Sequence, residues 1–164
     1  MSHVPRLLCV AVLLVSVCSC TEPYDPVPPT VNPVNPTNKA YPSEPGPIDD
    51  DAPEEMTLLD SGLQYRILRK SDGRKPTAAD SVFAHYAGWL EDGTQFDSSY
   101  DRGSPSQFSL SGVISGWTQG LQLIGEGGMI ELKIPSNLAY GPAGRPGIPP
   151  NATLLFRVEL FEVR

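Results

Sequence analysis

The chain has few residues that could bind a metal or form a disulfide. All three cysteines of its 164 residues, Cys9, Cys18 and Cys20, lie within the first twenty positions. A disulfide, a cysteine zinc site and a cysteine nucleophile are therefore excluded from residue 57 onward. His3 and His85 are the only histidines, which is too few for a histidine metal cluster. We accordingly expect neither a metal nor a cofactor.

Clustered positive charge is also missing. The formal net charge of −7 arises from residues 21–56, where eight acidic residues face a single base, Lys39. Residues 57–164 hold eleven acidic and ten basic residues and are nearly neutral. A nucleic-acid surface needs clustered Lys and Arg, so this composition argues against a nucleic-acid partner.

The first twenty residues have the pattern of an export signal. The apolar run from Leu7 to Val17 follows Arg6 and is shorter than the roughly 20 residues that a membrane span requires. It ends in the sequence Val-Cys-Ser-Cys, which resembles the end of a bacterial lipoprotein signal. The resemblance implies a signal peptide over 1–19 and lipidation of Cys20, and Thr21 favours the outer membrane. The alternative is an ordinary signal with incidental cysteines.

Residues 20–56 are acidic and rich in proline, with ten prolines between Glu22 and Pro53. Such a segment has too little apolar surface to offset chain entropy, so we expect a disordered tether. Its reach in the polyproline conformation, at about 3.1 Å per residue, is on the order of 100 Å. A partner-recognition role for the prolines is the alternative to a simple spacer.

Alternation of apolar and polar residues begins at residue 57 and predicts an α+β domain over 57–164. Ser115 is the expected cap of one helix, whose apolar stripe of Trp117, Leu121 and Ile124 ends before Gly125. The architecture expected is an antiparallel sheet of five to six strands and one short helix. The alternation predicts strands over 63–70, 82–90, 107–110, 129–134 and 153–163, with a shorter extended piece at Phe96-Asp97.

Five sequence blocks carry a specific resemblance across residues 58–164. They are Tyr86-Ala-Gly-Trp-Leu, Asp92-Gly-Thr-Gln-Phe-Asp-Ser-Ser, Gly112-Val-Ile-Ser-Gly-Trp, Ile134-Pro-Ser-Asn-Leu-Ala-Tyr-Gly and Gly147-Ile-Pro-Pro-Asn-Ala-Thr-Leu-Leu-Phe. Together and in this order they closely resemble the FKBP-type peptidyl-prolyl cis-trans isomerases. The resemblance implies a half-barrel sheet wrapped around the helix, with an apolar pocket that admits a proline ring.

The resemblance also implies roles for individual residues. The backbone N–H of Ile114 and the hydroxyl of Tyr140 would hold substrate carbonyls. Asp97 would face the carbonyl of the bond being turned, and Arg102 would position Asp97 and Tyr86. Trp117 would form the pocket floor and Ile148 would overhang the pocket. The walls would be Tyr86, Phe96, Phe108, Val113, Ile114 and Phe156.

The expected function is isomerisation of proline-containing polypeptides that fold in the periplasm, by an enzyme bound to the membrane only through its lipid. The rival hypothesis is a binding or chaperone module that holds proline-containing segments with little turnover. Macrolides are further candidate ligands, although a shortened loop at 141–148 and Arg145, where some relatives carry histidine, bear on their affinity. Related periplasmic isomerases carry a long helical dimerisation arm that the proline-rich tether cannot build, so we expect a monomer.

Two other chemistries can be weighed on the same residues. Ser98 or Ser99 with His85 and Asp97 suggests a hydrolase triad, but His85 and Tyr86 are adjacent on a strand, so His85 points to the opposite face. Residues 125–128 lack the lysine and the spacing of a phosphate-binding loop. Their glycines are explained by the end of the predicted helix. The isomerase is therefore preferred over both a hydrolase and a phosphate-binding protein.

Overall fold

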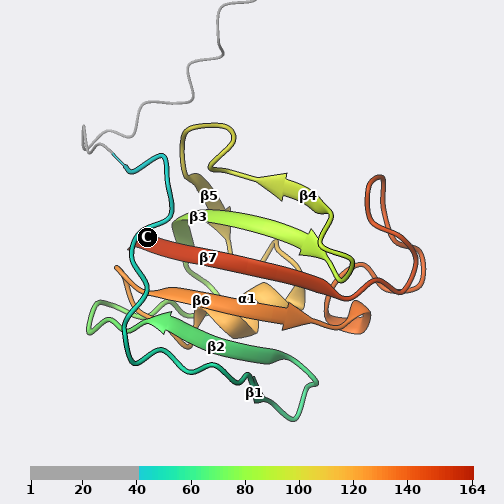
Figure 1. Ribbon diagram of the computed structural model, residues 1–164, viewed down its shortest axis with the longest axis horizontal. Helices are drawn as coiled ribbons and strands as arrows, with labels where there is room; N and C mark the ends of the chain where they lie inside the picture. Colours follow the sequence, from blue (N-terminus) through green and yellow to red (C-terminus); the bar gives the residue numbers. More distant parts are fainter. Residues whose placement is uncertain (1–40) are drawn as a thin grey trace, which may run out of the picture. The chain divides into compact units, whose positions relative to one another are not determined.

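The computed structural model describes residues 41–164, in which seven strands form one antiparallel sheet with a short helix on one face (Figure 1). The predicted signal peptide, Cys20 and the first part of the tether lie outside the described residues. The elements are β1 (Thr57–Leu58), β2 (Gln64–Arg69), β3 (Ser81–Leu90), β4 (Gln95–Ser98), β5 (Ser106–Ser109), α1 (Ser115–Leu121), β6 (Met129–Ile134), a 3₁₀ turn (Ser136–Leu138) and β7 (Leu154–Val163).

The strand order is β1-β2-β6-β7-β3-β4, and β5 pairs with β3 along the same edge as β4. Every pairing is antiparallel, as expected from the alternating pattern. The predicted α+β fold with one short helix is thus confirmed. The structure has one strand more than the five or six expected, because β1 is a two-residue strand without a periodic signal.

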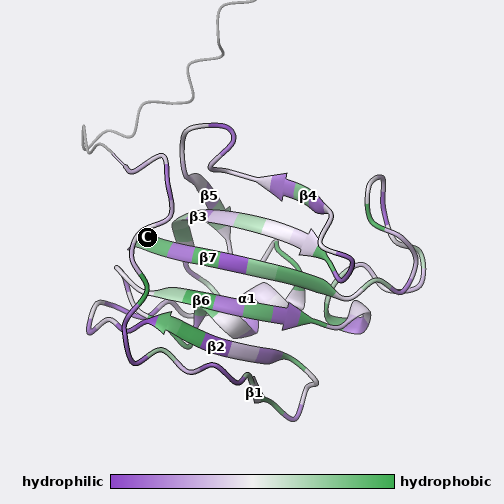
Figure 2. Cartoon of the chain, viewed as in Figure 1, coloured by the Kyte–Doolittle hydropathy of each residue, from purple (hydrophilic) through white to green (hydrophobic). Residues whose placement is uncertain are grey.

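The core fills the space between α1 and the facing side of the sheet. Along β7 the predicted inward residues Leu154, Phe156, Val158 and Leu160 are buried, and polar residues stand between the last three of them (Figure 2). The pairing between β3 and β7 shifts where Phe83 opposes Glu162 and Ala84 opposes Leu160, which leaves Phe161 as an extra residue. This bulge reverses the alternation, so that Val163 also joins the core.

Helix α1 is shorter than expected and is not capped by Ser115. The N-cap position belongs to Ile114, no side chain caps the helix, and Gln122 is the C-cap, so buried Ile124 lies beyond the helix end. Gly116 and Gly120 set the distance to the sheet. A Cβ on Gly116 would lie 2.4 Å from Ile134, and one on Gly120 would lie 2.5 Å from the side chain of Leu132 in β6. The two glycines therefore let the helix backbone approach the strand closely.

Residues 41–56, hereafter the N-terminal segment, differ from the expected disordered tether because they contact the sheet. The backbone N–H of Asp49 donates to the carbonyl of Leu68 (2.8 Å), and the Asp49 carboxylate accepts from the N–H of Lys70 (2.7 Å). Gly46 N–H donates to the carboxylate of buried Glu159 in β7 (3.3 Å). Backbone groups of Leu68 and Lys70 and the side chain of Glu159 thus provide partners that the composition of the segment does not reveal.

The ring of Tyr41 begins these contacts at the end of the sheet where β7 finishes. Its centroid lies 4.9 Å from the rings of both Phe83 and Phe161, and its hydroxyl donates to Glu162. Phe83 and Phe161 are on the side of β3 and β7 that faces away from the core. The N-terminal segment therefore enters the domain on the face of the sheet opposite α1.

Candidate functional site

A cavity of about 320 Å³ opens between α1 and the inner face of the sheet. All six predicted wall residues meet there although they come from four strands and the loop before α1. The cavity is lined by Tyr86, Phe96, Asp97, Phe108, Gly112, Val113, Ile114, Trp117, Tyr140, Arg145 and Phe156. Its size is at the lower end of the roughly 300–1,000 Å³ of small-molecule pockets.

Trp117 lies among the other aromatic rings, as expected of a pocket floor. Its ring packs edge-on against Tyr86 (5.3 Å between centroids), Phe108 (5.0 Å) and Phe156 (5.4 Å). Edge-to-face contacts of this kind hold aromatic side chains in fixed orientations. Trp117 is only 4% exposed, and within the described part of the chain its indole Nε1 has no hydrogen-bond partner. The walls are thus rigid and apolar.

Gly88 in β3 has no side chain, and this lets the rings of Phe96 and Phe156 pack directly against the strand. A Cβ at this position would lie 2.7 Å from both Phe96 and Phe156. Any larger residue would displace the two rings toward the cavity. The sequence blocks contain this glycine, but without the structure nothing indicated that it serves the pocket wall.

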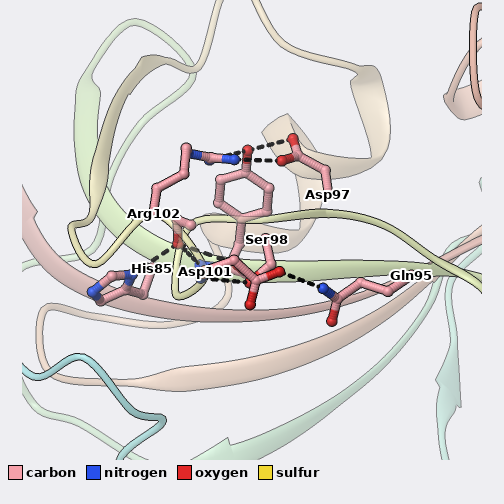
Figure 3. A network of polar contacts seen from close by, with 8 residues as sticks. His85, Gln95, Asp97, Ser98, Asp101 and Arg102 are labelled. Carbon is pink, nitrogen blue, oxygen red and sulfur yellow. Dashed lines mark hydrogen bonds and ion pairs between the residues drawn. The ribbon is translucent and has the colours of Figure 1, made fainter. Parts of the chain in front are cut away.

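Asp97, Arg102 and Tyr86 form a closed polar network at the cavity. Arg102 Nη1 donates to Asp97 Oδ1 (2.5 Å), and the pair is seen in Figure 3. Arg102 Nη2 donates to the Tyr86 hydroxyl (2.8 Å), which in turn donates to Asp97 Oδ2 (2.5 Å). Arg102 itself does not line the cavity, so the structure does not place it among the substrate-binding residues, and its contacts are those of a residue that positions Asp97 and Tyr86.

The network and its burial shift the pKa of both the Asp97 carboxyl group and the Tyr86 phenol. Burial alone would raise the pKa of Asp97, but hydrogen bonds from Tyr86 and Arg102 outweigh it and hold the pKa below its usual value. Burial and the neighbouring carboxylate raise the pKa of Tyr86 to about 12. Around neutral pH, Asp97 is therefore a carboxylate and Tyr86 a neutral phenol.

Two further residues that line the cavity, Ile114 and Tyr140, carry hydrogen-bond donors. The backbone N–H of Ile114, at the start of α1, donates no hydrogen bond within residues 41–164. The Tyr140 hydroxyl accepts from Arg145 Nη1 (2.9 Å), and its own proton has no acceptor in the described segment. Both donors line the cavity, as the sequence predicts. They can hold carbonyl oxygens of a bound chain.

Ile148 is placed differently from the expectation, and Arg145 was not expected at the site. Ile148 is 4% exposed, packs in the core and is not among the residues that line the cavity. Its burial follows from a tight turn in which Arg145 and Ile148 pair through both backbone hydrogen bonds. The same turn brings the Arg145 side chain to the cavity. The sequence marked Arg145 only as a departure from relatives that carry histidine.

The hydrolase triad has no structural basis. His85 is fully buried on the other face of β3, where its Nδ1 shares a hydrogen bond with Ser99 Oγ (2.8 Å) and its ring stacks on Tyr100. The carboxylate of Asp97 is instead bound by Arg102 and Tyr86. Burial also lowers the pKa of His85. The three residues of a triad are therefore not brought together.

An antiparallel sheet around one short helix, with an aromatic cavity between them, defines the class of domain found in FKBP-type proteins. The sequence profile described as FKBP-type peptidyl-prolyl cis-trans isomerase matches residues 72–161, more than half of the chain. The protein therefore belongs to the FKBP-type peptidyl-prolyl cis-trans isomerase family.

Individual relatives agree with this assignment. The isomerase FkpA of Escherichia coli K12 is 53% identical over 104 residues, which cover 63% of this chain and 38% of FkpA. Outer membrane protein MIP of Legionella longbeachae is 46% identical over 110 residues, 66% of this chain and 47% of MIP. The crystal structure of E. coli FkpA matches with a TM-score of 0.66 and 49% identity, covering 68% of this chain and 53% of that one. The chain spans half or less of these two curated relatives.

Proposed function

We propose that the protein is a peptidyl-prolyl cis-trans isomerase that acts on proline-containing segments of exported polypeptides. The observation that carries the proposal is an aromatic cavity lined by an ionised Asp97 and by two residues with unengaged donors, Ile114 N–H and Tyr140 O–H. Family membership supports it, because the E. coli relative is named as an enzyme of this kind.

The cavity suits a reaction that needs no nucleophile. Amide resonance opposes rotation of an X–Pro bond by ~20 kcal/mol, and the uncatalysed exchange takes tens to hundreds of seconds. In the transition state the bond is twisted out of conjugation and loses much of the polarity that water stabilises. Apolar walls therefore stabilise the twisted bond more than the planar one, which is what catalysis requires. A 10⁵-fold acceleration corresponds to about 7 kcal/mol.

Each polar residue has a separate part in this mechanism. Ile114 N–H and Tyr140 O–H fix two carbonyl oxygens of the substrate and hold the chain while the bond turns. Asp97 faces the carbonyl group of the turning bond, and Arg102 keeps its carboxylate in place. Because Arg102 and Tyr86 occupy both oxygens of Asp97, the carboxylate keeps one orientation throughout the reaction.

A binding module that holds proline segments without turnover is the second candidate, since the same cavity would serve it. We expect the protein to accelerate the exchange of an Ala-Leu-Pro-Phe peptide in proportion to its concentration, as measured by a protease-coupled assay. Tyr140→Phe removes one hydrogen bond and should lower kcat/KM about tenfold. Background exchange rates with retained peptide binding in an NMR titration would favour the binding module. Absence of both would overturn the assignment of the cavity.

The proposal extends to the cell envelope, with a signal peptide over 1–19, a lipid on Cys20 and a monomer held at the outer membrane on the periplasmic side. The sequence pattern of residues 7–20 supports it, and the Legionella relative is named as an outer membrane protein. Across residues 41–164, no helix is long and apolar enough to span a bilayer. Macrolides remain candidate ligands of the same cavity.

The lipid anchor can be tested by cell fractionation. Wild-type protein should sediment with outer membranes, whereas Cys20→Ser should appear in the soluble periplasmic fraction, because the lipid is its only proposed membrane contact. Cys18→Ser is the matched control and should stay with the membranes. Co-sedimentation of Cys20→Ser with the membranes would contradict lipidation at this residue.

A further inference from the structure

Arg145 differs from every other arginine in the described part of the chain. Residues 41–164 contain seven arginines, and six of them form an ion pair with a carboxylate. The polar side-chain contact of Arg145 is with a neutral group, the hydroxyl of Tyr140. No carboxylate within residues 41–164 pairs with its guanidinium. Arg145 is also the one arginine of the seven that lines the cavity.

The backbone around Arg145 is held firmly, so the position of its side chain is defined. Its N–H donates to the carbonyl of Ile148 (3.0 Å), and Ile148 N–H donates back (2.8 Å). Gly144, at φ +63°, precedes it in a conformation that favours glycine, and a Cβ there would lie 2.5 Å from the Ile148 carbonyl oxygen. Because Ile148 is buried in the core, this turn is attached to the body of the domain.

The guanidinium lies over the face of Tyr140. Its central carbon is 4.8 Å from the ring centroid, and Nη1 donates to the hydroxyl (2.9 Å). The hydrogen bond uses one of five N–H donors, so Nη2 and Nε are available to a ligand. The Tyr140 ring thus keeps the charge at the rim while the side chain stays exposed to solvent.

The balance of charge at the cavity follows from these contacts. The charged residues that line it are Asp97 and Arg145. The charge of Asp97 is already compensated by Arg102, which is 2.5 Å away. The guanidinium of Arg145 has no such partner in the described segment, so the rim of the cavity carries one uncompensated positive charge. A ligand with a carboxylate near its proline would supply the missing partner.

We propose that Arg145 determines specificity, by favouring proline segments in which an aspartate or glutamate is adjacent to the proline. The inference rests on the proposed function of the cavity as the site that binds proline. Since the guanidinium is exposed, the expected preference is modest, about three- to fivefold over the isosteric amide, and should shrink as salt is raised.

The test uses two series of otherwise identical tetrapeptides with Glu, Gln, Leu or Lys, placed before the proline in one series and after it in the other. We expect kcat/KM for Glu to exceed that for Gln by three- to fivefold in at least one series. Arg145→Met removes the charge and should bring the ratio close to one, and Arg145→Lys should keep part of it. Lys75→Met is the matched control, because Lys75 is exposed, bonds to the Leu123 carbonyl and does not line the cavity.

Two results would overturn the proposal. If Arg145→Met keeps the wild-type ratio of kcat/KM between the Glu and Gln peptides, the charge of Arg145 does not discriminate between substrates. If it lowers kcat/KM equally for all peptides, Arg145 only orients the Tyr140 hydroxyl. Failure of the isomerase function itself is recognised separately, as absence of turnover for the Leu peptides. In that event the ratio of Kd values for the Glu and Gln peptides, from NMR titration of wild type and Arg145→Met, decides the question of specificity.

Discussion

Replacing Gly125 with alanine is expected to lower the free energy of unfolding by about 3 kcal/mol, which is at the upper end of the cost of overpacking. A Cβ on Gly125 would lie 2.2 Å from the carbonyl oxygen of Gly73 and 2.8 Å from its carbonyl carbon. Both are backbone atoms, and hydrogen bonds hold the two segments together, including Glu126 N–H to the Arg74 carbonyl (3.0 Å). Equilibrium denaturation in urea measures the loss.

Gly112→Ala is the matched control for this prediction. Its Cβ would meet its nearest neighbour, the carbonyl oxygen of Ser109, at 3.7 Å, which is an ordinary contact. We therefore expect a change within about 0.5 kcal/mol. If Gly125→Ala were as stable as Gly112→Ala, the loop at Gly73 would not lie against the turn after α1 in solution.

Removing the carboxylate with Asp97→Ala is expected to lower kcat/KM about 100-fold, comparable with the loss of one preorganised polar group in other active sites. The substitution takes away the group that we propose faces the turning bond, and it leaves Arg102 and the Tyr86 hydroxyl without their shared partner. Kinetics with a proline tetrapeptide measure the loss, and a thermal unfolding curve establishes that the variant is folded.

Asp101→Ala provides the control, because it removes a neighbouring carboxylate that does not line the cavity. Asp101 is exposed and accepts a hydrogen bond from Gln95 Nε2 (2.7 Å), a contact also seen in Figure 3. Its kcat/KM should stay within about twofold of wild type. If a folded Asp97→Ala behaved in the same way, its carboxylate would have no part in catalysis.

The sheet could be predicted from the sequence because its strands, apart from the two-residue β1, each place one face against the core. Alternation in β7 identifies Leu154, Phe156, Val158 and Leu160 as inward residues, and all four are buried. The helix was predicted less well, because its stripe continues to Ile124 while its hydrogen bonds end near Gln122. Periodicity reports burial, and Ile124 is buried without being helical.

Other features had no signal in the sequence because they depend on pairing between distant residues. The N-terminal segment appears disordered by composition, yet Asp49 and Gly46 find partners on β2 and β7. Nine of the eleven site residues expected from the family motifs line the cavity, Ile148 and Arg102 do not, and the role of each residue stays a prediction. The unpaired state of Arg145 could not be foreseen, because it requires knowing where every carboxylate of the domain lies.

The attachment of Tyr41 has a mechanical consequence. A pulling force transmitted through the tether would first load the contacts of Tyr41 with Phe83 in β3 and Phe161 in β7. These two strands are neighbours and pair along most of their length, so many backbone hydrogen bonds would share the load. Tyr140 and Arg145 belong to the loop before β7 and not to the strand positions that Tyr41 contacts, so we expect the proposed substrate site to keep its geometry under tension on the tether.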